Sequence, residues 1–192
     1  MTFMDVTANS RGLLVGGYAS IAINRIFGNF GQGRGADSVE GAGYTTLPLL
    51  SPREENLRKV QDSISSISMH LPAGFVGGLN RQFANLMDDD AWEEDDELIA
   101  SLSMKAFTQL LIGTGTRRRP GIGTDGRGSV TASWSVGKDR LIAECLPSGK
   151  VSMVLSRERD SGEVERAAFG PLNPKRAREV LSPFSPGVWF DV

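Results

Sequence analysis

Hydrophobic and polar side chains alternate most regularly between residues 129 and 155 of this 192-residue chain. The first alternating run carries Trp134 on an apolar face and serines and threonines on the other, which is typical of a half-buried strand. Short glycine-containing turn signals separate this run from two more, and connections this short join antiparallel strands. We therefore expect a three- to four-stranded antiparallel meander, at residues 129–136, 141–146, 151–155 and, in the four-stranded case, 164–169.

The second alternating run does not fix which of its faces is buried. Leu141, Ala143 and Cys145 occupy one face, while Ile142 and Leu146 occupy the other. Both sets are apolar, and a shift of one residue in the register exchanges the two faces of a strand. The sequence alone leaves both alternatives open.

A helical spacing of apolar residues begins after Ser51. Ser51 and Glu54 form the capping-box pattern Ser-x-x-Glu, and Pro52 suits the first position of a helix. The apolar residues that follow recur at intervals of three and four and form one stripe, which needs a partner surface. The residues of this stripe are Leu57, Val60, Ile64, Ile67 and Leu71.

Other apolar stripes predict further helices. A second, shorter helix is expected over residues 79–87, a third runs from Leu98 to Leu111 with Gly113 as its stop, and Asn173-Pro174 opens a last one. The aromatic residues of the tail are expected to dock on the core. Three or four helices beside a half-polar sheet indicate an α+β fold, with the helices packed against one face of the sheet.

The chain divides into an arm and one domain. Residues 1–47 are rich in glycine and poor in charge, which predicts a flexible glycine-rich N-terminal arm. The expected α+β domain, residues 48–192, comprises a helical part (51–112), the β-meander (129–169) and a C-terminal helix and tail (173–192). The arm also supplies candidate partner-binding residues, namely Tyr18, Ile21, Phe27 and Phe30.

Composition restricts the chemistry that the chain can perform. One histidine and one cysteine leave few candidates for acid–base or thiol catalysis, and the glycine-rich stretches lack the context of a phosphate-binding loop. We therefore expect no catalytic residue and no cofactor. A single cysteine excludes an internal disulfide, and no apolar run has the ~20 residues that span a bilayer. These features favour the cytoplasm and no membrane partner.

Charge is distributed unevenly along the chain. Residues 1–112 contain 8 basic and 14 acidic residues, whereas residues 113–192 contain 13 and 9. Eight of the acidic residues surround Trp92 in the run Asp88–Glu97. Carboxylates around an indole can imitate a nucleic-acid backbone and enter the basic groove of an RNA-processing or DNA-binding protein. The candidate partner-binding residues of this run are Asp89, Asp90, Trp92, Glu93, Glu94, Asp95 and Asp96.

The charged residues also allow two alternative functions, nucleic-acid binding and metal-dependent hydrolysis. A basic loop over residues 117–127 can contact nucleic-acid phosphates, although a pI of 5.5 argues against a dedicated nucleic-acid-binding protein. The candidate residues for this alternative are Arg117, Arg118, Arg119, Arg127 and Lys138. A weaker alternative is a metal-dependent hydrolase whose acidic run holds magnesium. That run lacks the spacing of a calcium loop, so we assign no metal ligand.

Part of the chain resembles a widespread group of small bacterial proteins. The shared features are an acidic start with Trp92, the helix at 98–111, and the segment Gly121–Val130 with Asp125-Gly126-Arg127-Gly128, followed by Trp134 and Pro147-Ser148-Gly149. Such proteins often accompany toxins or defence genes. Group members tend to have Asp-Gly after the tryptophan, where this chain has Glu93-Glu94. The resemblance implies an antitoxin-like, non-enzymatic regulator that masks a partner protein.

Overall fold

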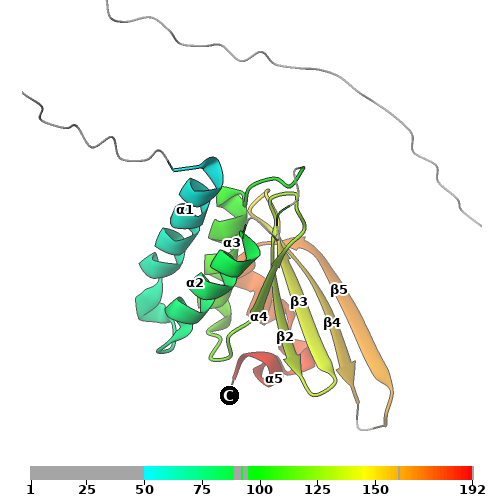
Figure 1. Cartoon of the computed structure of the whole chain (residues 1–192). Helices are drawn as coiled ribbons and strands as arrows, with labels where there is room; N and C mark the ends of the chain where they lie inside the picture. Colours follow the sequence, from blue (N-terminus) through cyan, green and yellow to red (C-terminus); the bar gives the residue numbers. More distant parts are fainter. Residues whose placement is uncertain (1–49, 89–91, 93–94, 160, 192) are drawn as a thin grey trace, which may run out of the picture. The chain divides into compact units, whose positions relative to one another are not determined.

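The computed structural model describes residues 50–88, 92, 95–159 and 161–191 (Figure 1). Several predictions lie outside these residues: the arm at 1–47 with Tyr18, Ile21, Phe27 and Phe30, and the acidic residues Asp89, Asp90, Glu93 and Glu94. The described part of the chain forms an α+β structure that combines a five-stranded antiparallel sheet with helices. No helix in this part is both long and apolar enough to cross a membrane.

The sheet is a simple meander in which each strand pairs with the next. Its order is β1-β2-β3-β4-β5, with all pairs antiparallel. The strands are β1 (Gly121–Thr124), β2 (Val130–Val136), β3 (Asp139–Cys145), β4 (Val151–Glu158) and β5 (Val164–Leu172). The expected count of three to four strands was wrong, because β1 lies in the segment predicted to be a basic loop, residues 117–127. Two of its four residues are glycines, which leave no side-chain alternation to detect.

One face of the sheet is buried and the other is open to solvent. Leu141, Ala143 and Cys145 of β3 are fully buried, whereas Ile142 is 44% exposed, which resolves the register that the sequence left open. The inward residues of β2 and β4 are buried beside them, as their alternation predicts. The three longest described helices, α1 (Pro52–Ser66), α2 (Phe75–Leu86) and α3 (Ser101–Thr114), all lie on the buried side of the sheet (Figure 1).

Helix α1 (Pro52–Ser66) begins at Ser51, as predicted. The Ser51 Oγ accepts a hydrogen bond from the Glu54 amide at 3.2 Å, and the Ser51 amide donates to the Glu54 carboxylate at 2.7 Å. These bonds satisfy amides that a helix start leaves without partners. The predicted stripe is confirmed, since Val60, Ile64 and Ile67 are buried, and the other two residues pack against the same core.

Helix α2 (Phe75–Leu86) and the short 3₁₀ helix η1 (Ser68–His70) follow, and helix α3 spans Ser101–Thr114. The third helix therefore starts three residues later than its apolar pattern suggested. The backbone before it bonds elsewhere: the Glu97 amide donates to the Gly126 carbonyl at 2.9 Å, and the Ala100 amide donates to the Gly128 carbonyl at 3.0 Å. Tertiary hydrogen bonds to a distant loop thus set the start of α3.

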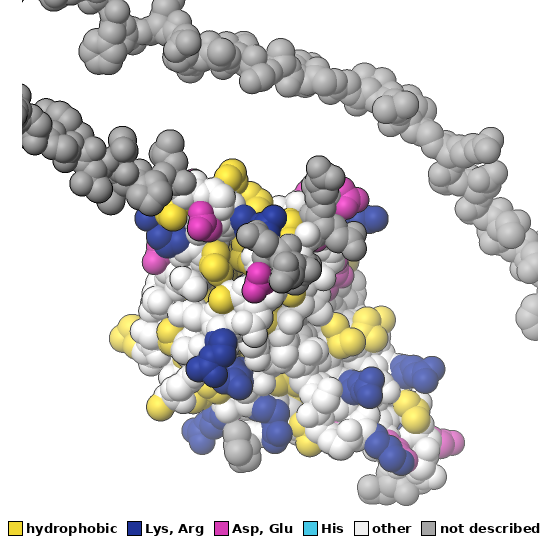
Figure 2. Space-filling view, viewed as in Figure 1, with side chains coloured by type: hydrophobic (Ala, Val, Ile, Leu, Met, Phe, Trp, Pro, Cys, Tyr) yellow, Lys and Arg dark blue, Asp and Glu magenta, His cyan; other side chains and the backbone are white. Residues whose placement is uncertain are grey.

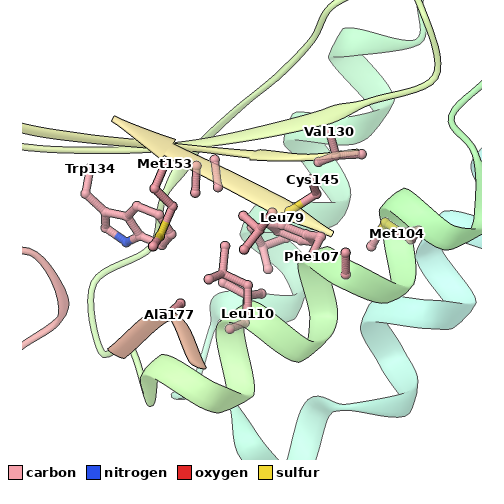
Figure 3. Packing of buried hydrophobic residues seen from close by; sticks show 14 of the residues in the cluster. Leu79, Met104, Phe107, Leu110, Val130, Trp134, Cys145, Met153 and Ala177 are labelled. Atoms are coloured by element: carbon pink, nitrogen blue, oxygen red, sulfur yellow. The ribbon is translucent and has the colours of Figure 1, made fainter. Parts of the chain in front are cut away.

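The C-terminal segment docks on the core, as expected, but in shorter pieces than one helix. These are η3 (Pro174–Arg176), α4 (Ala177–Val180), η4 (Ser182–Phe184) and α5 (Gly187–Phe190). The Phe190 ring meets Trp134 edge to face, with their centroids 5.2 Å apart. In Figure 3, Leu79, Phe107 and Leu110 of the helices point toward Val130, Cys145 and Met153 of the sheet. The core therefore lies between the helices and the sheet.

Cys145 lies within this core, and we predict that its thiol does not react in the folded protein. Burial, and to a smaller extent the charge of Glu144, raises the pKa of the Cys145 thiol to about 12. The thiolate is the reactive form, so the native side chain is both protonated and shielded. Titration with a thiol reagent should label Cys145 only after denaturant is added. Stoichiometric labelling of the native protein would contradict the buried position.

Candidate partner-binding site

A surface groove of about 790 Å³ lies between the start of α1, the end of α2 and the segment that leads to α3. We call it the Trp92 groove. Its apolar lining consists of Leu57, Ala84, Met87, Trp92 and Leu98. Its charged lining consists of Arg53, Glu54, Asp88 and Asp96. Figure 2 shows exposed hydrophobic side chains, with charged ones beside them, at the end of the molecule where α1 begins.

Trp92 forms one wall of this groove and is held there by contacts within the chain. Its indole Nε1 donates a hydrogen bond to the Asp96 carbonyl at 3.3 Å, and the Arg53 guanidinium carbon lies 5.5 Å from the centre of its ring. The side chain is half-buried and packs against the hydrophobic core. A cation over an indole face is attracted by the negative face of the ring. Trp92 is therefore a fixed apolar surface of the groove.

The predicted acidic residues that the structure describes lie beside this tryptophan. Asp95 is exposed, Asp96 is half-buried in the groove lining, and Asp88 lines the groove from the end of α2. Glu97 forms an isolated parallel bridge with Arg127 in the loop between β1 and β2. Of these carboxylates, Asp88 and Asp96 line the groove, which places negative charge beside its apolar wall.

The loop between β1 and β2, residues 125–129, anchors this acidic segment. The Asp125 Oδ1 accepts hydrogen bonds from the Arg127 amide at 2.9 Å and the Ser129 amide at 3.0 Å. Burial acts to raise the pKa of Asp125, but these hydrogen bonds to its charged form outweigh burial and lower that pKa below its usual value. The ionised side chain therefore holds the loop in the shape that receives the Glu97 and Ala100 amides.

Close packing explains the glycines in this loop. Gly126 and Gly128 both have positive φ, at +69° and +79°. A Cβ added to Gly128 would lie 3.2 Å from the Leu98 carbonyl oxygen, and one added to Gly126 would collide with the Asp96 carboxylate. The Asp-Gly-Arg-Gly motif thus lets two distant segments meet. The sequence offered the motif itself as a signal, but not the segment against which it packs.

The five basic residues proposed for nucleic acid occupy two ends of the sheet. Arg127 lies in the loop before β2, whereas Lys138 lies in the turn after it, where its Nζ is 2.8 Å from the Glu158 carboxylate. A strand of seven residues separates them, and at ~3.3 Å per residue they are roughly 20 Å apart or more. The remaining three, Arg117, Arg118 and Arg119, precede β1 near the Lys138 end.

The three consecutive arginines also have structural contacts. The amides of Arg117 and Arg118 both donate to the Phe190 carbonyl, and the Arg118 carbonyl accepts a hydrogen bond from the Trp134 indole at 3.0 Å. The Arg119 side chain packs directly over Gly78 of α2. This segment therefore joins the C-terminal helix, the sheet and α2.

Among the described residues, no group of three or more His, Cys, Asp or Glu side chains is placed to hold a metal ion. Comparison with protein-family models, curated proteins and solved structures found no match to this chain. The fold and the site together define an α+β protein with a five-stranded meander and an acid-rimmed apolar groove.

Proposed function

We propose that this chain is a non-enzymatic bacterial regulator, antitoxin-like or defence-associated, that masks a partner protein through the Trp92 groove. The observation that carries the proposal is the combination of an apolar groove wall at Trp92 with a rim of carboxylates. Protein interfaces place apolar and aromatic anchors at their centre and charged residues at the rim. The groove has this arrangement.

The chemistry of the groove specifies the kind of partner segment. Leu57, Met87 and Leu98 offer an apolar surface, and Asp88 and Asp96 lie beside it. The run Asp88–Glu97 carries eight carboxylates and no basic residue. A basic segment with one or two apolar side chains is complementary to such a surface, as are the cationic surfaces of proteins that bind nucleic acid. The partner is therefore expected to be a toxin or nuclease with a basic surface.

The reactive side chains of the described region favour binding over catalysis. The chain has a single histidine, His70, which is exposed at the end of η1, and a single cysteine, whose thiol is buried and protonated. Neither lines the Trp92 groove. Acid–base catalysis needs a group of suitable pKa within reach of the substrate.

A charge placed in the groove tests the proposal. We expect that a partner captured from the native host, identified by mass spectrometry and purified, binds Leu98→Lys at least about tenfold more weakly than the wild type. Leu98 is 37% exposed, so its replacement leaves the core intact. The interaction should also weaken as salt is added, because the groove is rimmed by exposed charges. Titration calorimetry would measure both effects.

The matched control is Ile142→Lys. Ile142 is similarly exposed, at 44%, but lies on the open face of the sheet, away from the groove. Its replacement adds the same charge and should leave the affinity unchanged. Equal weakening by both variants, or full affinity in Leu98→Lys, would count against the groove as the binding site. If the partner is equally toxic to cells with and without this chain, the proposal that the chain masks the partner is wrong.

A further inference from the structure

The sheet has one long edge without a partner strand in the described region. Strand β5 pairs with β4 on one side, and no other described strand pairs with its outer side. The opposite edge, β1, is only four residues long and is contacted by α2. Strand β5 is nine residues long and forms the edge of the sheet farthest from α1 and α2 (Figure 1). An open edge presents backbone donors and acceptors that another strand can satisfy.

The side chains of this edge do little to block pairing. From Ala167 to Phe169 the strand is uncharged, and a register irregularity and Pro171 follow near its end. The regular part, residues 164–170, therefore carries charge only at Glu165 and Arg166. Natural edges are commonly protected by charges, prolines or bulges. In β5 the charges lie in its first half, and the register irregularity and Pro171 lie near its end, so Ala167, Ala168 and Phe169 carry no such protection.

The charge pattern of β5 fits a second copy of the same strand. A two-fold axis perpendicular to the sheet at Ala167 pairs the two strands antiparallel and keeps each residue on its own face. Arg166 then lies opposite Ala168 of the other copy, and Glu165 lies opposite Phe169. The charged half of each strand faces the uncharged half of the other, so no like charges lie directly opposite.

The same alignment extends an apolar row on the open face of the sheet. Ile142, Val154 and Ala168 are register partners on β3, β4 and β5 and all three are exposed. Ala168 brings this row to the edge, where it would meet the aliphatic stem of the opposite Arg166. A long arginine side chain can cover apolar surface while its guanidinium stays in water.

We propose that β5 is a homodimerisation edge, through which two copies of this chain join antiparallel into one ten-stranded sheet. The contact involves about seven residues from each copy and is small beside the roughly 800 Å² per partner of a standard interface. The dimer is therefore expected to dissociate on dilution. This inference is independent of the Trp92 groove, which lies at the helical side of the molecule.

Two substitutions at Ala168 test this alignment, because they are expected to change the affinity of the dimer in opposite directions. Ala168→Glu places a carboxylate opposite Arg166 of the second copy, and Ala168→Lys places an ammonium there. Because the two-fold axis repeats each pair, we expect the dissociation constant of the full chain to fall about fivefold for Ala168→Glu and to rise about fivefold for Ala168→Lys. Sedimentation equilibrium over a wide concentration range measures the three constants.

Val154→Glu and Val154→Lys provide the matched control. Val154 is 54% exposed and pairs with Ala168 on the same face, one strand in from the edge, so its charge should hardly affect dimerisation. The order Ala168→Glu, wild type, Ala168→Lys in decreasing affinity supports the proposal. A wild type that stays monomeric at every concentration would overturn it. So would an oligomer whose dissociation constant is the same in both Ala168 variants as in the wild type, or one whose dissociation constant changes in the same direction in both variants.

Discussion

Trp134→Ala should destabilise the folded domain by about 3–5 kcal/mol, the usual loss for a buried tryptophan. Trp134 is only 1% exposed and packs edge to face against Phe190 at 5.2 Å. Its indole also donates to the Arg118 carbonyl at 3.0 Å, so that alanine leaves a cavity and removes one of the two hydrogen bonds that this carbonyl accepts, the other coming from the Thr116 hydroxyl at 2.7 Å. Typical domains are stable by only 5–15 kcal/mol in total. Denaturation with urea, followed by circular dichroism, measures the change.

Trp92→Ala is the matched comparison for this prediction. Both residues are tryptophans with an indole hydrogen bond to a backbone carbonyl, but Trp92 is half-buried at the wall of a groove. Its removal takes less apolar surface from the core, and we expect less than half of the loss seen for Trp134→Ala. A similar loss for the two variants would contradict the assignment of Trp134 as the centre of the core.

Gly128→Ala should cost about 2–4 kcal/mol and also weaken partner binding. An alanine at φ +79° is strained, and its Cβ would lie 3.2 Å from the Leu98 carbonyl oxygen, closer than ordinary contact. Relief of this contact moves the segment before α3 a few tenths of an ångström away from the loop and weakens the hydrogen bond from the Ala100 amide to the Gly128 carbonyl. Because Leu98 and Asp96 line the Trp92 groove, the groove changes shape with it.

Gly137→Ala separates the two causes of this loss. Gly137 has φ +58°, but a Cβ there would meet nothing within 4 Å. It therefore reports the cost of the backbone conformation alone, which we expect to be about 1–2 kcal/mol, with no change in partner affinity. Denaturant titrations of both variants give the difference. Equal losses for Gly128→Ala and Gly137→Ala would show that the contact with Leu98 is unimportant.

Local patterns predicted much of the fold correctly. The capping box at Ser51, the α1 stripe and the alternation of β2 and β4 each depend on neighbouring residues, and all three are present. The sequence shows such signals because apolar periodicity and helix caps depend on residues only a few positions apart. Strand β1 escaped detection because glycines carry no side-chain pattern, and its existence depends on pairing with β2.

The candidate site likewise combines features that the sequence shows with contacts that only the structure shows. The acidic run and Trp92 are visible in the sequence, and so is the Asp-Gly-Arg-Gly motif about thirty residues later. Nothing local says that these segments touch. The structure joins them through the amides of Glu97 and Ala100, and it adds Leu57 and Met87, which we had read only as helix residues, to the groove lining. In contrast, Arg127 and Lys138, which were grouped by charge, lie at opposite ends of β2.

The sequence by itself determined the α+β class, the start of α1 and the two-faced character of the meander, because each follows from the spacing of apolar side chains and from caps formed within a few residues. Only the tertiary structure decided which face of β3 is buried, where α3 begins and that Trp92 lies in a groove. Those features depend on contacts between residues far apart in the chain. Their energies arise from packing and hydrogen bonding between segments, which local periodicity does not encode.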